Sequence, residues 1–532
     1  MKETKNIRAY LVGGGIASLA SAVYLIQDGH VPGKNIYILE ESDKMGGSLD
    51  SIGSSETGYI ARGGRMFSDE VHNCTYNLFS LIPLSENSPK TLLNDFIDFN
   101  KEAKVNAGAR LIEGGKIIDS SNFGVSMEDG LNMIKIMSLP ESFLDNTKIS
   151  GHFSPSFFKT NFWNLFCTTF AFQPWHSVVE FKRYILRFIQ ELPRMNTMTG
   201  VRNTRYNQYD SVIVPITNWL KNNNVNFLME SRVSSLEFTK DDNKERVEKI
   251  VYLQQNRKDE FSLGKNDLVF LTNGSMTTNS TFGSMKSAPV IKTSAPHDSW
   301  ALWKDISRNR PYFGNPLVFN GQIDKSKWES FSVTFKNRVF ANLMEDFSKN
   351  KSGTGGITTF KDSNWLLSVV TPPQPHFINQ AGDINVFWGY GLCPDREGNY
   401  VHKKMPKCSG REIMTEVCSH LGFTKELSDI LRSLDCVPCI MPYITSQFMP
   451  RKKGDRPLVI PEHTENFAFI GQFCEIPDEI VFTVEYSIRS AMIAVYGLLG
   501  IKKEIPPIYQ GLRDQETIKE LFKTVFNLDL IK

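Results

Sequence analysis

A strand, a glycine turn, a helix and a second strand that ends in acid constrain the fold of this chain more than any other feature. The apolar run at 9–12 leads into the glycines at 13–15, and apolar residues at helical spacing follow over 16–23. A second strand pattern covers 35–39 and ends at Glu40. This order is typical of the βαβ unit that binds a dinucleotide; the alternative is an ordinary strand-to-helix turn.

Each part of this unit has an expected role. Gly13 permits the tight turn, and Gly15 lets a pyrophosphate approach the backbone at the positive end of the helix. Ser18 takes the place of the third glycine of the fingerprint and is small enough for close packing. Glu40 is placed to bind a ribose hydroxyl. The contacts expected in this unit are Gly13, Gly15, Ala17, Ser18, Glu40 and Glu41.

Two more glycine pairs follow, at 46–47 and 63–64. An NAD-binding protein does not need them, whereas the larger FAD, with its isoalloxazine ring lying along the loop, would explain them. Arg65 could contact the pyrophosphate, and the alternative for both pairs is an ordinary glycine turn. The contacts expected here are Gly47, Ser48, Arg62, Gly64 and Arg65.

The chain then returns to the same fold twice. Residues 267–275 are a strand that runs into a glycine turn, and 466–473 are another. The second leads into a helical pattern, and a flavin fold uses such a late unit to place a helix N-terminus against the pyrimidine end of the ring. The contacts expected from these returns are Asn273, Gly274, Ser275, Gly471, Phe482 and Thr483.

These segments predict an α/β fold with a discontinuous, Rossmann-like FAD-binding domain. A helical and mixed substrate-binding region is inserted into it, and a helical segment ends the chain. The expected boundaries are 1–100, 200–290 and 440–500 for the FAD-binding domain, 101–199 and 291–439 for the substrate region, and 501–532 for the C-terminal segment.

The composition of the chain excludes some classes of binding partner and cofactor. The chain has 532 residues with 60 Lys and Arg against 58 Asp and Glu, so nothing indicates nucleic-acid binding. Eight Cys do not make a disulfide framework at this length, and the C-x-x-C of Cys436 and Cys439 has no second pair, so we expect no metal. The first strand leaves no room for a leader peptide, and the apolar stretch at 491–501 is too short to span a bilayer. We therefore expect a cytoplasmic protein.

Two helical regions are candidates for contact with apolar partners. Aromatic residues are densest at 161–188, where a plain core is the usual interpretation. The C-terminal stretch 517–532 is amphipathic, and such a helix could dock on the body of the protein or lie peripherally on a membrane surface. The apolar residues that share its face are Ile518, Leu521, Phe522, Val525 and Phe526.

Seven stretches, in order over nearly the whole chain, together resemble the oleate hydratase family, also called the myosin-cross-reactive antigen family. They are Gly13 to Ala20, Gly46-Gly47-Ser48-Leu49-Asp50, Arg62-Gly63-Gly64-Arg65, Phe170-Ala171-Phe172-Gln173-Pro174-Trp175-His176-Ser177, Tyr206-Asn207-Gln208-Tyr209, Met441-Pro442-Tyr443-Ile444-Thr445-Ser446 and Gly454-Asp455-Arg456-Pro457-Leu458-Val459. The combination is highly specific for that family.

The resemblance implies an FAD-dependent enzyme that adds water to the cis-9 double bond of free oleate, and of linoleate or palmitoleate, to give a 10-hydroxy fatty acid. The reaction is redox-neutral, yet in the family the reduced flavin favours activity. The family's proton donor, a tyrosine, matches Tyr184, and its glutamine near the substrate path matches Gln208. Trp175 and His176, in the aromatic motif, are expected at the substrate.

The sequence departs from the family at two places. The family motif commonly reads Arg-Gly-Gly-Arg-Glu-Met, and its glutamate is thought to activate water; Met66 stands there in this chain, as in one branch of the family. Asp69 or Glu70 could take over that role. In the family's carboxylate clamp only His376 is retained, and His376 or Gln374 is expected to meet the substrate carboxylate.

Two rival functions stay open, and so does the oligomeric state. A flavin oxidoreductase of the amine-oxidase or desaturase kind shares the glycine-rich entry, but its flavin would be reduced by substrate. A relative that binds flavin and fatty acid without catalysis would bind oleate and form no product. In the family, a longer segment before the first strand helps dimers form. That segment is short here, so a monomer is expected, with a homodimer as the alternative.

Overall fold

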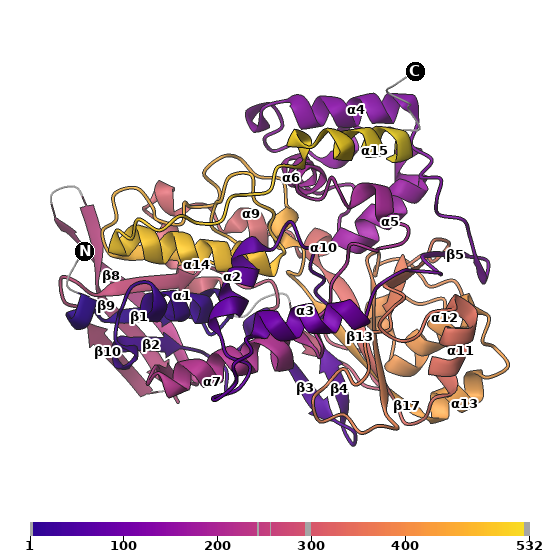
Figure 1. The fold of residues 1–532 in the computed structure, drawn as a ribbon, viewed down its shortest axis with the longest axis horizontal. Helices are drawn as coiled ribbons and strands as arrows, with labels where there is room; N and C mark the ends of the chain where they lie inside the picture. Colours follow the sequence, from indigo (N-terminus) through magenta and orange to yellow (C-terminus); the bar gives the residue numbers. More distant parts are fainter. Residues whose placement is uncertain (1–3, 242–243, 256, 293–298, 526–532) are drawn as a thin grey trace.

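The computed structural model describes residues 4–241, 244–255, 257–292 and 299–525 (Figure 1). Its cofactor-binding part is a parallel sheet of five strands in the order β18-β11-β1-β2-β7. Every residue of β1, β11 and β18 but Thr272 is buried, as expected for a sheet covered on both faces. The strands are β1 (Ala9–Val12), β2 (Ile36–Leu39), β7 (Asn226–Leu228), β11 (Leu268–Thr272) and β18 (Phe467–Ile470).

Two long helices pack against each other beside this sheet. Their first turns follow the glycine-containing ends of β1 and β18, and most of their side chains are buried. A three-stranded antiparallel sheet, β10-β9-β8, adjoins the same part (Figure 1). The helices here are α1 (Ile16–Gln27), α2 (Asn73–Leu81), α3 (Leu92–Glu102), α7 (Val214–Asn222) and α14 (Val484–Leu499), and the antiparallel strands are β8 (Ser231–Asp241), β9 (Lys244–Gln254) and β10 (Arg257–Ser262).

The second part is built on an eight-stranded mixed sheet in the order β12-β17-β13-β16-β15-β14-β5-β6. A two-stranded sheet, β3 (Ser51–Ser54) with β4 (Gly58–Ala61), packs on β13 and β17 and leads the cofactor part into it. The eight strands are β5 (Leu111–Glu113), β6 (Lys116–Ile117), β12 (Thr281–Phe282), β13 (Trp328–Phe335), β14 (Ile357–Phe360), β15 (Leu367–Val370), β16 (Asn385–Gly391) and β17 (Leu434–Met441).

This sheet refines the expected division of the chain. β12 lies in a stretch that the sequence assigned to the cofactor-binding part, yet it pairs with β17 in the second sheet. Short helices cover the end of the sheet farthest from the cofactor part (Figure 1). The helices after β12 are α8 (Ala301–Ser307), α9 (Leu317–Asn320), α10 (Ile323–Ser326), α11 (Val339–Ser348), α12 (Gly410–Leu421) and α13 (Leu427–Arg432).

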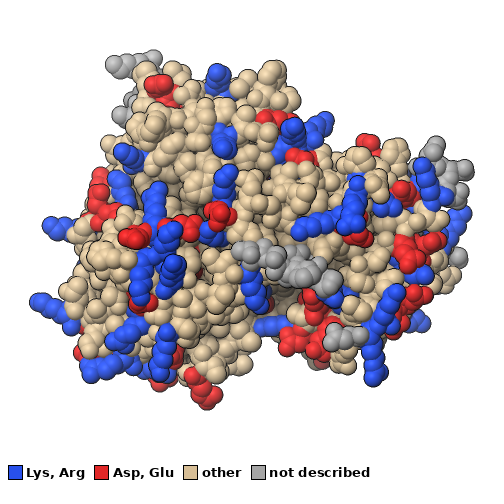
Figure 2. Space-filling model, turned by 180° about the vertical axis from the view of Figure 1, so that it is seen from behind, with Lys and Arg blue, Asp and Glu red and all other residues tan. Residues whose placement is uncertain are grey.

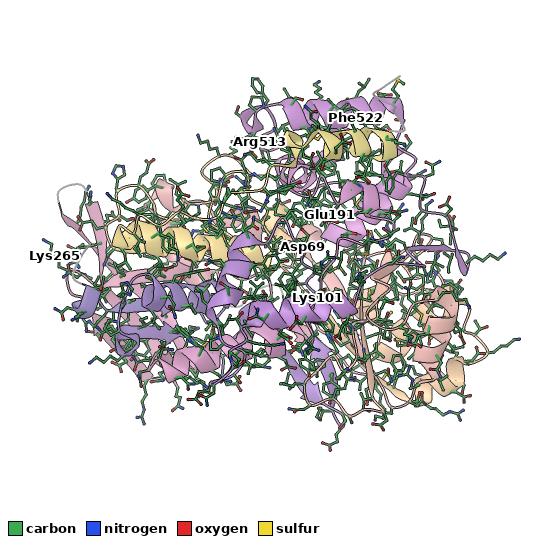
Figure 3. The ribbon with its side chains drawn as sticks, viewed as in Figure 1. Asp69, Lys101, Glu191, Lys265, Arg513 and Phe522 are labelled. Carbon is green, nitrogen blue, oxygen red and sulfur yellow. The ribbon has the colours of Figure 1, made fainter. Side chains whose placement is uncertain are left out.

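A helical group forms the third part of the molecule. It consists of α4 (Met127–Ser138), α5 (Asn161–Phe170), α6 (Val178–Arg187) and the C-terminal α15 (Gln515–Val525), which lies close to α4 in Figure 1. α15 contacts residues 192–194 and 511–513, with Leu521 and Val525 buried and Phe522 partly buried (Figure 3). The expected apolar face of this helix therefore docks on the protein over its described residues; Phe526 lies outside them.

The surface charge and the lengths of the apolar helices concern two possible partners, nucleic acid and membrane. Lys and Arg are interspersed with Asp and Glu over the face in Figure 2, as the near-zero net charge predicts. Within the described residues, we find no helix that is long and apolar enough to cross a membrane.

Candidate active site

The turn between β1 and α1 has the geometry expected for phosphate binding. Gly13 has φ +99°, and its amide donates to the Leu39 carbonyl at 2.8 Å, which draws the ends of β1 and β2 together. Gly15 is the N-cap of α1 with no side-chain cap, so the amides of the first turn stay available. A Cβ on Gly15 would meet no atom within 4 Å, which leaves open space at the positive end of the helix.

The small and acidic residues of the unit lie around this turn. Glu40 Oε2 accepts from the Gly14 amide at 2.5 Å, and its Oε1 accepts from the Ser42 amide at 2.8 Å. Ala17 is buried in α1, and Ser18 Oγ lies 3.4 Å from Thr272 Oγ1, so a small residue does allow α1 to approach β11. Glu41 is exposed directly after β2, and Ser48 is partly buried in the short 3-10 helix Gly47–Leu49.

The second glycine pair and the arginine motif form the next wall. The Gly46 amide donates to the Gly14 carbonyl at 2.9 Å, and a Cβ on Gly47 would lie 3.2 Å from Gly15 Cα. Arg62 donates to Asp50 Oδ1 at 2.7 Å and to the Gly47 carbonyl at 2.8 Å, so its guanidinium joins the two loops. Arg62 thus holds the loops that surround the cofactor position.

Arg65 is the cation that an anionic ligand can reach. Among the described residues, its guanidinium makes one hydrogen bond, to the Gly63 carbonyl at 3.4 Å. Burial, together with the nearby Arg62, lowers the pKa of Arg65 to about 10. A Cβ on Gly64 would meet nothing within 4 Å, so the backbone of this loop borders free space. A partly buried cation beside free space is a site for a negatively charged or electron-rich group.

The two returns of the chain complete the cofactor position. Asn273 Nδ2 donates to the Phe473 carbonyl at 3.0 Å, while its buried Oδ1 has no hydrogen-bond partner among the described residues. Gly274 has φ +87° and no room for a Cβ against the Trp300 ring, and Ser275 Oγ contacts Thr277 Oγ1. The Gly471 amide donates to Ser490 Oγ at 2.9 Å. The orphaned Asn273 oxygen fits a ligand with a hydrogen-bond donor.

The N-terminus of α14 borders a cavity that the arginine motif also lines. Thr483 is its N-cap and accepts from the Tyr486 amide at 3.2 Å, and Phe482 before it has φ +70°. Phe482, Thr483 and Val484 all line a cavity of about 1250 Å³. The positive end of a 16-residue helix therefore faces the cavity, as predicted for the pyrimidine end of a flavin. Open space at Gly15, the free Asn273 oxygen and this helix end fit an FAD.

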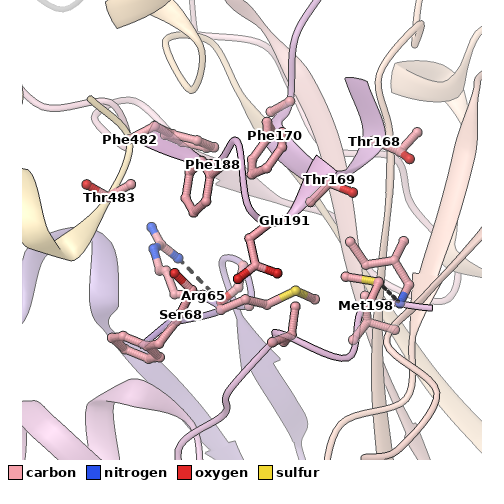
Figure 4. Close-up of a pocket in the computed structure, with 18 of the residues that line it drawn as sticks. Arg65, Ser68, Thr168, Thr169, Phe170, Phe188, Glu191, Met198, Phe482 and Thr483 are labelled. Atoms are coloured by element: carbon pink, nitrogen blue, oxygen red, sulfur yellow. Dashed lines mark hydrogen bonds between the residues drawn. The ribbon is translucent and has the colours of Figure 1, made fainter. Parts of the chain in front are cut away.

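This first chamber extends from the arginine motif into the helical group (Figure 4). Its walls are mostly apolar and aromatic, with a few polar groups. They include Met66, Phe67, Phe170, Tyr184, Phe188, Met195, Trp328, Trp388 and Tyr390 as the large side chains, and Arg65, His72, Thr168, Glu191 and Arg194 as the polar ones.

Tyr184 lies in this chamber on α6. Its hydroxyl donates to the Val481 carbonyl at 2.5 Å, next to the N-terminus of α14. The ring centroids of Phe170 and Phe172 lie 5.1 and 4.9 Å from that of Tyr184. Burial among these rings raises the pKa of Tyr184 well above its usual value. The phenol therefore keeps its proton until a group in the cavity takes it.

Buried ion pairs fix α6 on both sides of Tyr184. Arg183 pairs with Glu141 and Glu475, both at 2.8 Å. Arg187 pairs with Glu479 at 2.9 Å. Such buried pairs add little net stability but specify one arrangement, so they hold the tyrosine in position.

A second chamber of about 630 Å³ shares the wall of residues 63–66, Val201, Val370 and Trp388 with the first. His376 lines it, with a buried Nδ1 that has no partner among the described residues, and burial lowers the pKa of His376 to about 4. Gln208 lines it as well and donates to the Arg65 carbonyl at 3.0 Å, which holds the arginine motif. Met66 borders both chambers.

Three expected substrate contacts lie elsewhere. Trp175 Nε1 donates to the Lys325 carbonyl at 2.9 Å, and His176 Nδ1 accepts from the Gln173 amide at 3.0 Å, in the turn before α6. Gln374 exchanges hydrogen bonds with the backbone of Val386 and with Gln380. None of the three borders either of these two chambers, and their contact with substrate stays a prediction. Their polar groups are used to fix turns.

The two cysteines of the C-x-x-C motif lie on one strand. Cys436 and Cys439 are three positions apart on β17, so their side chains point to opposite faces of that strand.

Sequence reasoning missed Glu191 and Trp388 in the cavity. Glu191 lies in the turn after α6, which ends at Arg187, so no helical pattern indicated it. No local pattern distinguished Trp388 from a core tryptophan.

The parallel sheet with its glycine turn defines a protein with the Rossmann-like fold of flavoproteins, and a largely apolar cavity lies beside its arginine motif. Cyclohexylamine oxidase from Brevibacterium oxydans shares this fold, with a TM-score of 0.54 at 13% identity over 93% of this chain and 99% of the other. The chain belongs to the MCRA family, which matches residues 6–496.

Two relatives resemble the chain over almost its whole length. An oleate hydratase of Streptococcus pyogenes is 38% identical over 98% of this chain and 89% of the relative. A linoleate hydratase of Lactiplantibacillus plantarum is 31% identical over 98% of each. The resemblance seen in the motifs is therefore confirmed.

Proposed function

We propose that this protein is an FAD-dependent fatty acid hydratase, a carbon–oxygen lyase that adds water to the cis-9 double bond of oleate, and of linoleate or palmitoleate. The product is a 10-hydroxy fatty acid. The observation that carries the proposal is Tyr184, a buried and protonated phenol in an apolar chamber that begins at the cofactor position. The hydratase activity of both relatives supports it.

The chemistry requires an acid that can protonate an unactivated alkene in a dry site. The Tyr184 hydroxyl supplies that proton after turning from the Val481 carbonyl toward the chain of the substrate. The faces of Trp388 and Tyr390, whose centroids lie 4.8 Å apart, border the same chamber and stabilise positive charge on carbon. FAD, when bound, would supply an electron-rich ring to the site, and its reduced form is proposed to favour activity.

The second chamber is the proposed position of the substrate carboxylate. Its polar groups include the His376 imidazole, which can donate a hydrogen bond from one ring nitrogen while neutral. The hydrocarbon chain would then pass Met66 into the first chamber, which is apolar and long enough to lead to Tyr184.

Substitution of His376 by alanine is expected to raise the KM for oleate about tenfold and to leave kcat within about threefold, because the lost hydrogen bond binds substrate and transition state alike. Steady-state kinetics on the flavin-loaded variant measure both constants. Gln374→Ala is the comparison, since Gln374 does not border the chambers. An unchanged KM in His376→Ala would place the carboxylate elsewhere.

Anaerobic mixing of the FAD-loaded protein with oleate tests the proposed function against an oxidoreductase. The spectrum of oxidised flavin should persist while 10-hydroxystearate forms, because hydration is redox-neutral. Bleaching of the flavin by substrate would instead show an oxidoreductase. Binding of oleate without product, with flavin reduced by added reductant, would show a relative without catalysis.

A further inference from the structure

Hydration needs a group that takes a proton from the attacking water, and Met66 cannot do so. We propose that Glu191 is that group: its carboxylate accepts the proton of the water that attacks the alkene. The proposal rests on the proposed function, and it names the residue that replaces the glutamate absent at position 66.

Glu191 is the one carboxylate among the described residues that border either chamber. The acids suggested by sequence, Asp69 and Glu70, do not border them. Asp69 Oδ2 pairs with Arg202 at 2.7 Å, and its side chain is 56% exposed. The Glu191 side chain is only 11% exposed, and Figure 4 shows its carboxylate pointing into the cavity.

Two features hold the carboxylate of Glu191 in this position. Arg194 donates to its two oxygens at 2.8 and 2.7 Å, and a bidentate pair of this kind leaves each oxygen a further lone pair. A Cβ on Gly200 would lie 1.9 Å from Glu191 Oε2, so any other residue at 200 would displace the carboxylate. The site is therefore oriented before substrate binds.

The other titratable groups of the chamber are poor proton acceptors. His72 Nδ1 accepts from the Ser68 amide at 3.1 Å, and burial lowers the pKa of His72 to about 4. Arg65 and Arg194 are cations. The Tyr390 hydroxyl donates to the Thr168 carbonyl. A carboxylate is the natural base in such surroundings.

Tyr184 and Glu191 lie seven residues apart in the chain and border the same chamber. Tyr184 lies on α6, which ends at Arg187, and the Phe188 amide donates to the Tyr184 carbonyl at 3.0 Å. Glu191 lies in the turn that follows, where its amide donates to the Phe188 carbonyl at 2.8 Å. The acid and the proposed base therefore face one chamber from consecutive parts of the chain.

The step balances with water as the only co-reactant. The π electrons of the alkene take the Tyr184 proton, and a C–H bond forms. A lone pair of the water oxygen forms the C–O bond at the other carbon, while the proton of that water passes to Glu191. Return of this proton to the tyrosinate through water restores both residues, so that one water has been added.

The test compares wild type, E191Q, the double variant M66E/E191Q and D69N, all loaded with FAD, in the hydration of oleate and the dehydration of 10-hydroxystearate. E191Q keeps an oxygen for Arg194 but loses the base, so we expect kcat to fall about 100-fold in both directions with KM nearly unchanged. The double variant M66E/E191Q, which carries a carboxylate at position 66, should have a kcat at least about tenfold higher than that of E191Q. D69N should keep the wild-type kcat, because Asp69 does not border either chamber, and all four proteins should bind flavin alike.

Three results would overturn the assignment of Glu191. They are an E191Q that keeps more than about a third of wild-type kcat, an E191Q loss that M66E does not relieve, and an E191Q that no longer binds flavin. The second and third results would give Glu191 a structural role. Absence of product with wild type would instead refute the proposed function, and so the two failures are distinct.

Discussion

Replacement of Tyr184 by phenylalanine is expected to lower kcat for oleate hydration by about 10²- to 10⁴-fold, the usual contribution of a positioned general acid. The variant removes only a hydroxyl whose partner in the structure is the Val481 carbonyl. The ring keeps its contacts with Phe170 and Phe172, so the fold and the flavin content should change little. Single-turnover formation of hydroxystearate, with flavin absorbance per chain, measures both effects.

Tyr252→Phe is the matched control. Its hydroxyl also makes a hydrogen bond, to Asp259 at 3.2 Å, but in the three-stranded sheet away from the chambers. It should hydrate oleate at the wild-type rate. If Tyr184→Phe retained kcat within about threefold of wild type, Tyr184 would not be the proton donor and the proposed chemistry would need another acid.

Replacement of Gly15 by glutamate is expected to weaken FAD binding by about 100-fold or more while the protein stays folded. Gly15 has φ −77° and ψ 175°, a conformation that any residue adopts, and its Cβ would meet no protein atom within 4 Å. The new carboxylate would occupy and repel the place of the pyrophosphate. Titration of the apoprotein with FAD, followed by flavin fluorescence, gives the change in Kd.

Gly151→Glu is the control for this prediction, because a Cβ on Gly151 also meets nothing within 4 Å but the residue lies in the helical group. It should bind FAD as wild type does. Normal FAD affinity in Gly15→Glu would mean that the cofactor does not use the turn between β1 and α1.

The cofactor-binding part could be predicted from sequence because its signals are local. The glycine turn at 13–15 directly precedes α1, and Glu40 directly follows β2 and binds the Gly14 amide. The strand and glycine at 466–473 likewise precede α14. The predicted fold class is confirmed by the parallel sheet and by the shared fold of a flavoprotein. The close approach of Ser18 to Thr272 is a consequence of the same local geometry.

The substrate part could not be predicted in the same way. Its eight-stranded sheet joins β5 to β14 across more than 240 residues, and no local pattern encodes such a pairing. Trp175 and His176 lie in the turn before α6 and do not border the two chambers, whereas Tyr184 on that helix does. Glu191 was missed because a lone glutamate near the end of a helix resembles a solvated residue until the surrounding walls are known.

Incubation of the purified, FAD-loaded protein with oleic acid and a reductant in oxygen-18 water, without oxygen, tests the proposed function most directly. Mass spectrometry should find hydroxystearate that carries one heavy oxygen, and fragmentation should place it on carbon 10. A product without the label, or no product although flavin and oleate are both bound, would contradict the proposal that this protein hydrates fatty acids.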